Sequence, residues 1–197
     1  ARNSIFAGVM PSEIAKKYPD KWSNDDEDGG KNLEEHFFVE EQLKRNNLNI
    51  KLSYNKVLNL SYGNKVLGDI PGLFNNPFNV IVYNFVDMLS HARTDTQIIK
   101  ELAADESAYR SVVKSWFEHS PIISTLKEIA ARGGTVFITT DHGSIRVKDA
   151  VKIVGDKEVN SNLRYKQGRT LNYNPKEVFE VKNPETAHLP KINMSQS

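Results

Sequence analysis

Apolar residues along the chain follow two periods, and together they predict a mixed α/β fold. Ile50, Leu52 and Tyr54 alternate with polar neighbours, which is typical of a half-buried strand. The runs "FNVIVYNF" at 78–85 and "TVFITT" at 135–140 are apolar on both faces, as expected for strands buried in a parallel sheet. The hydrophobic pattern therefore predicts strands at three places along the chain.

Between the last two of these strands, from residue 94 to 131, the period becomes helical. One apolar stripe repeats at i, i+3, i+4 and i+7, and a second stripe resumes after a break at Pro121. Gly133 and Gly134 predict the end of the helical region. A strand, a helical crossover and a second strand form a βαβ unit, so the fold class predicted is α/β with a mostly parallel sheet. The residues of the two stripes are Tyr109, Val112, Val113 and Trp116, and then Ile122, Leu126, Ile129 and Ala130.

The rest of the chain predicts smaller elements. Residues 1–9 and 11–19 indicate two short helices, separated by Pro11. Asn32 is placed to cap a helix that runs to about Arg45, with Glu35 in the capping-box position. The Gly-, Asn- and Pro-rich connection at 62–77 predicts a loop with at most one helical turn, and short strands and turns are expected after residue 145.

Composition narrows the class of protein. The 197 residues are 39% hydrophobic, and 26 basic against 25 acidic side chains give a net charge of +1. A net charge this close to zero argues against a protein that mainly binds nucleic acid or membrane surfaces. The absence of cysteine excludes disulfides and thiolate metal sites. No apolar run reaches the roughly 20 residues that span a bilayer, and the start lacks a signal-peptide pattern, so a cytoplasmic location is expected.

Charge is unevenly distributed along the chain. The acidic stretch at 23–41 is interpreted as a solvated face. Residues 141–170 carry a local excess of three positive charges, which suits either a solvated surface or a rim for a phosphate-bearing substrate.

Two Asp/His pairs carry the candidate chemistry. Asp87 and His91 follow one predicted strand, and Asp141 and His142 follow another. Because ligands bind beyond the carboxyl ends of strands in open α/β sheets, we expect both pairs to meet in one crevice. Their oxygen and nitrogen donors suit zinc or manganese better than magnesium or calcium. Two simpler interpretations stay open: Asp87 could cap a helix, and Asp-His-Gly could be only a strand-ending turn.

The same residues carry a family resemblance. "TTDHG" after an apolar run, preceded by "NFVDMLSH", resembles the alkaline phosphatase superfamily, whose members work with two metal ions. The resemblance is closer to its PglZ branch. The stretches "ARNSIFAGVMPSEIAKKYPDKW", "AYRSVVKSWFEHSP" and "NLRYKQGRTLNYNP" are similar to the PglZ effector domain of PorX-type response regulators, which are linked to type IX secretion.

The resemblance implies a partial alkaline-phosphatase-like three-layer fold and roles for particular residues. Asp141 and His142 would hold the zinc ion that activates the nucleophile, and Asp87 with His91 would hold a second zinc ion. The implied activity is that of a phosphoesterase, in particular a phosphodiesterase acting on nucleotide-type substrates. Arg2 and Asn3 would lie at the start of a helix near the substrate phosphate, although packing or capping roles for them stay open.

The resemblance also implies how the parent protein is organised. Residues 1–197 would be the central fragment of one PglZ-type domain. A receiver domain and a nucleophilic Thr are expected before Ala1, and a His-Gly-Gly metal-ligand segment after Ser197. The fragment alone is therefore expected to be inactive. The alternative is a non-catalytic, metal-stabilised module that binds a partner such as a sigma factor or a secretion component, and a homodimer is also possible.

Overall fold

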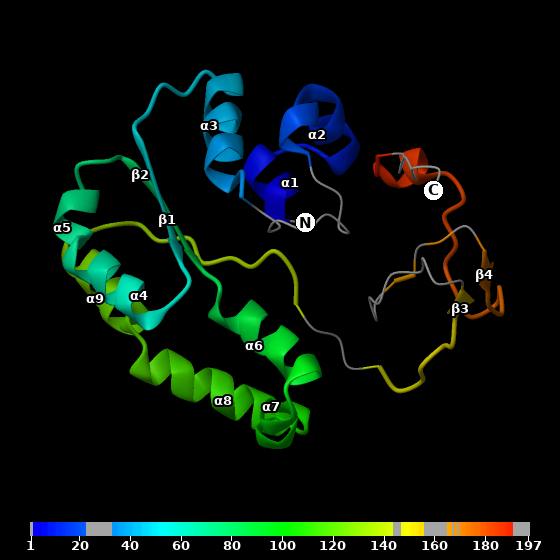
Figure 1. Ribbon diagram of the computed structural model, residues 1–197. Coiled ribbons are helices and arrows are strands. Elements are labelled where there is room, and N and C mark those ends of the chain that lie inside the picture. Colours follow the sequence, from blue (N-terminus) through cyan, green and yellow to red (C-terminus); the bar gives the residue numbers. More distant parts are fainter. Residues whose placement is uncertain are drawn as a thin grey trace. The chain divides into compact units, whose positions relative to one another are not determined.

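A computed structural model describes residues 2–22, 33–143, 147–155, 165–166, 168 and 170–190 (Figure 1). The chain divides into two compact units. One consists of Ala1–Phe38 together with Thr140–Ser197, and the other consists of Val39–Thr139. Each unit is described by itself.

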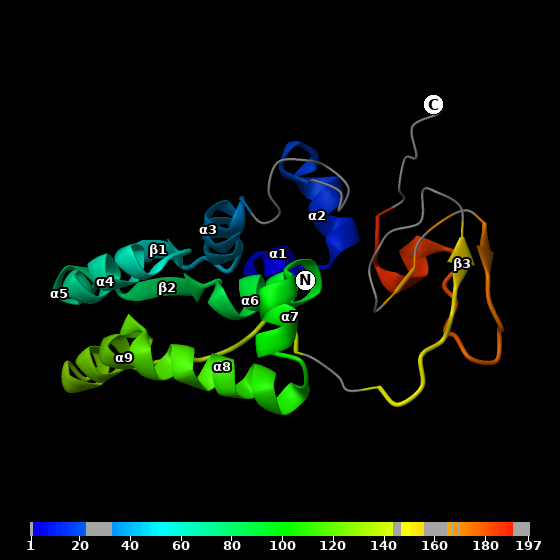
Figure 2. The same ribbon diagram turned by 60° about the horizontal axis from the view of Figure 1, so that its bottom comes forward.

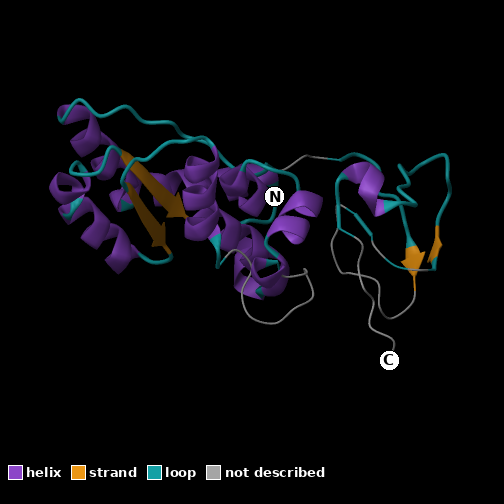
Figure 3. Cartoon of the chain, turned by 90° about the horizontal axis from the view of Figure 1, so that it is seen from above, coloured by secondary structure: helices purple, strands orange, loops and turns teal. Residues whose placement is uncertain are grey.

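Two parallel strands form the sheet of the Val39–Thr139 unit. Strand β1 (Leu52–Val57) pairs with β2 (Phe78–Tyr83), from Leu52 opposite Phe78 to Val57 opposite Tyr83, and Figure 3 shows both strands pointing the same way. The amide of Asn84 donates to the Val57 carbonyl over 3.2 Å and extends the ladder by one bond. The predicted α/β class with a parallel sheet is confirmed, and the sheet has two strands within the described part of this unit.

The connection between the two strands contains more helix than expected. Helices α4 (Leu60–Gly68) and α5 (Ile70–Leu73) occupy most of it. The Asn59 side chain caps α4 by accepting the Tyr62 amide at 2.8 Å, and Val66 and Ile70 bury apolar surface. The expectation of a loop with at most one turn was wrong, because Asn59 begins a helix that the high Gly, Asn and Pro content conceals.

Helix α4 packs very closely on its neighbours at Gly63. A Cβ atom at this position would lie 2.7 Å from Pro121 Cγ and 3.3 Å from Val57 Cγ1. Only a residue without a side chain allows α4 to approach helix α9 (Pro121–Ala131) and strand β1 at this distance.

The helical region after β2 is confirmed. It comprises α6 (Phe85–Asp95), α7 (Gln97–Leu102), α8 (Glu106–His119) and α9, which begins at the predicted break, Pro121. Figure 2 shows α8 and α9 on the same side of the strand pair. The predicted apolar stripe packs there through Trp116, whose ring stacks on Phe85 with centroids 4.3 Å apart and meets Tyr83 edge-on at 6.1 Å.

Gly133 ends α9, as its sequence position predicts. Its φ of +72° lies in the left-handed region. The Gly133 amide donates to the Ala130 carbonyl and the Gly134 amide to the Ile129 carbonyl, each over 3.0 Å, which is the hydrogen-bond pattern of a Schellman motif.

The run "TVFITT" does not form the predicted strand. Residues 134–140 have no regular secondary structure, and the side chains of Phe137 and Ile138 are 91% and 80% exposed. The residues favour extended backbone, but a strand also needs a hydrogen-bonded neighbour, and a local pattern does not supply one. The parallel crossover is therefore made by β1, α4, α5 and β2. With no third strand beside it among the described residues, β2 is half-buried to exposed along its length and not fully buried as predicted.

The other unit has an aromatic core near the start of the chain. Helices α1 (Arg2–Ala7) and α2 (Pro11–Lys17) confirm the two predicted short helices, and a 3₁₀ turn, η1 (Pro19–Lys21), follows. Ala7, Ile14 and Phe38 are buried together, and the rings of Tyr18 and Phe37 meet edge-on at 5.3 Å.

Helix α3 (Glu35–Arg45) begins two residues later than its predicted cap implies. Asn32 lies outside the described residues. Glu35 is the first helical residue, so its predicted capping-box role was wrong.

Short strands after residue 145 are confirmed. Strands β3 (Val154–Gly155) and β4 (Leu171–Asn172) pair antiparallel, and a 3₁₀ helix, η2 (Pro184–Ala187), follows. The His188 carbonyl then accepts the Ser12 amide at 2.9 Å, which links this segment to the start of α2. Of the basic residues in 141–170, Arg146, Lys157, Arg164 and Arg169 lie outside the described residues. In the described ranges, no helix is both long enough and apolar enough to cross a bilayer.

Two buried hydroxyl groups face the interior where β2 ends. Tyr83 OH and the Thr125 hydroxyl of α9 are both buried, and neither makes a hydrogen bond of good geometry with the described residues. Burial raises the pKa of Tyr83, and the neighbouring Thr125 hydroxyl lowers this pKa again in part.

A pair of glycine substitutions tests the close approach of α4. We expect Gly63→Ala to lower the free energy of unfolding by about 1–3 kcal/mol, because the added methyl group meets the Pro121 ring. Gly68→Ala in the same helix is the control, since a Cβ there meets no atom within 4 Å; it should be neutral or stabilise by up to about 1 kcal/mol. Urea denaturation measures both values. Equal effects at the two positions would contradict the close packing.

The raised pKa of the buried Tyr83 predicts that the protein loses stability at alkaline pH. Because the folded-state pKa lies above the unfolded value of about 10, the stabilisation from the neutral phenol is complete below pH 10 and is lost as the pH rises through the folded pKa. Tyr83→Phe should flatten this decline and leave stability at pH 7 unchanged or slightly higher. Tyr109→Phe, which removes a hydroxyl bonded to the Val86 carbonyl, should keep the decline. Urea denaturation between pH 8 and 11 makes the comparison.

Candidate metal centre

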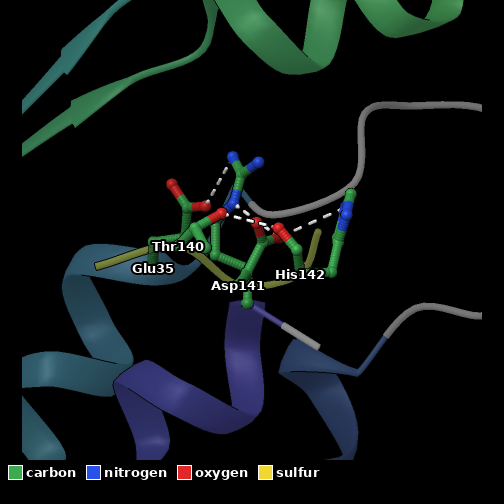
Figure 4. Close-up of polar contacts among 5 residues, drawn as sticks. Glu35, Thr140, Asp141 and His142 are labelled. Atoms are coloured by element: carbon green, nitrogen blue, oxygen red, sulfur yellow. Dashed lines mark hydrogen bonds and ion pairs between the residues drawn. The ribbon is translucent and has the colours of Figure 1, made fainter. Parts of the chain in front are cut away.

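Asp141 and His142 lie side by side on a turn that Thr140 closes. The Thr140 hydroxyl donates to the His142 carbonyl over 2.7 Å. In this arrangement Asp141 Oδ2 and His142 Nε2 are 3.9 Å apart (Figure 4). The Asp141 side chain is 20% exposed and that of His142 45%. The turn thus brings a carboxylate oxygen and an imidazole nitrogen together at a surface that a small ion can reach.

Arg2 lies between the turn and a buried carboxylate. Its Nε is 3.4 Å from Asp141 Oδ2, and its Nη1 is 3.3 Å from Glu35 Oε1. The exposed fractions of the Arg2 and Glu35 side chains are 11% and 1%. Arg2 begins α1, as predicted, and these two contacts are both to carboxylates. The predicted role of Arg2 in binding a substrate phosphate stays a prediction.

Asn3, the second predicted substrate-binding residue, follows Arg2 on α1. Its Oδ1 atom is buried and makes no hydrogen bond with the described residues. Helix α1 has six residues. The predicted role of Asn3 therefore also stays a prediction.

Asp87 and His91 lie on α6, directly after β2. They are four residues apart on one helix, the spacing that places two side chains on the same face. Asn84 occupies the N-cap position and Asp87 lies in the first turn, where a carboxylate also stabilises a helix, so the simpler interpretation of Asp87 stays open. The His91 side chain lies outside the described part of the structure. Because this pair belongs to the Val39–Thr139 unit and Asp141 with His142 to the other unit, convergence of the two pairs stays a prediction.

Glu35 is the site residue that the sequence analysis missed. It lies in the acidic stretch at 23–41, which was interpreted as a solvated face, and for Glu35 that interpretation was wrong. A weak signal was available. Glu35, Phe38 and Val39 follow the i, i+3, i+4 pattern of one helix face, and all three are buried.

The Asp141–His142 pair fits one divalent ion in donor type and spacing. Two ligands about 2.0–2.1 Å from a tetrahedral zinc ion lie roughly 3.4 Å apart, so a shift of about half an ångström would suffice. In the described ranges, no group of three or more His, Cys, Asp or Glu side chains lies close enough together to hold an ion. The two residues therefore supply half of a four-coordinate site.

Comparison with known proteins identifies the class. A family model described as the BREX system PglZ alkaline phosphatase-like domain matches residues 1–194. No curated protein sequence matches the chain. The chain belongs to the PglZ family, a branch of the alkaline phosphatase-like domains, which have a phosphoesterase-type fold and are generally metal-dependent. The predicted family is thereby confirmed, and the response-regulator context and the identity of the ion stay predictions.

Because the Arg2–Glu35 pair is buried, removing one of its charges should strongly lower the free energy of unfolding. We expect Arg2→Met to lower the free energy of unfolding by about 3 kcal/mol, because it removes the cation next to a carboxylate that is 1% exposed. Arg110→Met breaks the Arg110–Glu106 pair, in which Arg110 is 77% exposed, and should cost about 1 kcal/mol or less. Chemical denaturation of both variants measures the difference. Equal losses would show that burial does not govern the Arg2 contact.

Proposed function

We propose that the chain is part of a metal-dependent phosphoesterase, in particular a zinc-dependent phosphodiesterase that acts on nucleotide-type substrates. The observation that supports this proposal best is the Asp141–His142 turn, with donor atoms 3.9 Å apart, in a chain of the PglZ family. Phosphate-ester substrates agree with the phosphoesterase-type fold of the family.

The four predicted ligands divide into two roles in this proposal. Asp141 and His142 hold one ion, and Asp87 and His91 hold a second. When bound, such ions lower the pKa of a hydroxyl nucleophile and neutralise charge on the transferred phosphoryl group. Thr140 contributes by fixing the turn, since its hydroxyl is bonded to the His142 carbonyl. Arg2 restrains the Asp141 carboxylate through its Nε, and in this proposal it also binds a substrate phosphate.

The proposed catalytic unit is larger than these 197 residues. By resemblance, the nucleophilic Thr belongs to a segment before Ala1 and a further His ligand belongs to a His-Gly-Gly segment after Ser197. A receiver domain ahead of this unit would make the protein a PorX-type response regulator linked to type IX secretion, acting in the cytoplasm. Residues 1–197 by themselves are then inactive.

A second candidate function is a metal-stabilised interaction module without catalysis. Two observations favour it: the Asp141 carboxylate is in contact with Arg2, and Phe137 and Ile138 are apolar side chains that are largely exposed. Such a module would bind a sigma factor, a secretion component or a second copy of the chain.

Assays of the intact protein on a bis(nitrophenyl) phosphate diester test the first proposal. We expect turnover with zinc, and EDTA should abolish it. Loss of a residue that only hydrogen-bonds to a metal ligand typically costs about 10- to 100-fold in activity. Asp141→Asn or His142→Ala removes a ligand itself, so each should lower kcat/KM by more than that. Asp87→Asn and His91→Ala should do the same.

Matched controls come from the same chain. Asp149→Asn removes an exposed carboxylate eight residues after Asp141. His119→Ala removes an exposed imidazole that is bonded to Ser115 O of its own helix. Both should leave kcat/KM nearly unchanged, because neither residue belongs to the proposed site. Absence of turnover by the intact protein would favour the interaction module. Zinc-independent turnover, or full activity of the Asp141 and His142 variants, would contradict the proposed metal centre. Turnover by residues 1–197 alone would contradict the external nucleophile.

A further inference from the structure

The feature that the proposed chemistry leaves unused is Glu35. Its carboxylate is 1% exposed and contacts Arg2 Nη1 at 3.3 Å, while the Nε of the same guanidinium is 3.4 Å from Asp141 Oδ2. Arg2 thus connects a buried carboxylate to the carboxylate that is proposed to hold an ion. Among the described contacts, Glu35 reaches Asp141 only through Arg2.

The charges of these three residues decide how attractive the turn is to a cation. Asp141 and Glu35 each carry one negative charge and Arg2 carries one positive charge, so the group has one net negative charge. Without Glu35 the net charge would be zero, and the guanidinium would both repel a divalent ion and bind Asp141 more tightly. Low exposure strengthens each of these interactions, because water screens them little.

We infer that Glu35 is a positioning residue of the metal centre: it holds Arg2 and neutralises its charge, so that Asp141 can bind a divalent cation while it keeps its contact with Arg2. The inference rests on the proposed function, since it requires a cation at Asp141. It assigns Glu35 an effect on cation affinity in addition to the stability that the buried pair provides.

Calorimetric titration of the intact protein with Zn²⁺ and with Mn²⁺ tests the inference through affinity, independently of catalysis. Glu35→Gln keeps the size of the side chain and removes its charge, and we expect it to weaken binding by about tenfold or more. Glu35→Asp keeps the charge and should stay within about threefold of the unmodified chain. Glu35→Gln combined with Arg2→Met restores one net negative charge and should regain most of the affinity, although it lacks the ion pair.

The double variant separates charge from structure. If Glu35 were only a structural element, the double variant would bind at least as weakly as Glu35→Gln, and that result would overturn the inference. Should the double variant not fold, as judged by circular dichroism, Glu35→Gln with Arg2→Lys replaces it. This variant keeps the positive charge and should bind as weakly as Glu35→Gln alone, whereas restored affinity would overturn the inference.

The same titrations distinguish the inference from the proposed function. If the unmodified chain binds the ion, Asp141→Asn abolishes binding and Glu35→Gln has no effect, the inference about Glu35 fails and the proposed metal centre stands. If the unmodified chain binds neither ion, or if Asp141→Asn binds as well as the unmodified chain, the metal centre at this turn fails and the inference fails with it.

Discussion

The ion pair between Arg2 and Glu35 is the interaction on which the candidate site depends. Both side chains are largely removed from water, so either charge without the other would cost several kcal/mol. The pair joins the first helix of the chain to the start of α3, and the second contact of Arg2 reaches Asp141, 139 residues further along the chain. The position of the Asp141–His142 turn within its unit therefore depends on a contact made at the second residue of the chain.

Local signals predicted the helices well and the sheet only in part. Pro121 and Gly133 mark the two ends of α9, because each acts on its own backbone: one begins a helix and the other adopts the left-handed conformation that ends it. The runs at 78–83 and 135–140 have similar composition, yet only the first is a strand. Strand formation depends on a partner elsewhere in the chain, which "FNVIVY" finds in β1 and "TVFITT" does not find in the described structure. Capping chemistry explains the opposite error at α4, where Asn59 begins a helix in a segment rich in helix breakers.

The sequence predicted those site residues whose role follows from the chemistry of their own side chain. Asp141 and His142 stand out because metal donors are adjacent after an apolar run, and the structure keeps them within 3.9 Å of each other. Glu35 could not be assigned in the same way. Its importance comes from burial against a distant arginine, whereas its place in the acidic stretch at 23–41 indicates solvent exposure. The relation between Asp87 with His91 and Asp141 with His142 depends on how two units are placed, which no local pattern encodes.

The segment at 135–140 has a consequence for the behaviour of the chain in concentrated solution. It is six residues long, has no charge and no proline, and is rich in β-branched and aromatic residues. Its backbone groups make no backbone hydrogen bond with the described residues, and such a stretch is a template onto which the same stretch of another molecule can add as a cross-β layer. Whether the chain stays dispersed in solution therefore depends on whether Phe137 and Ile138 are covered. Self-association through this segment does not require the two units to unfold.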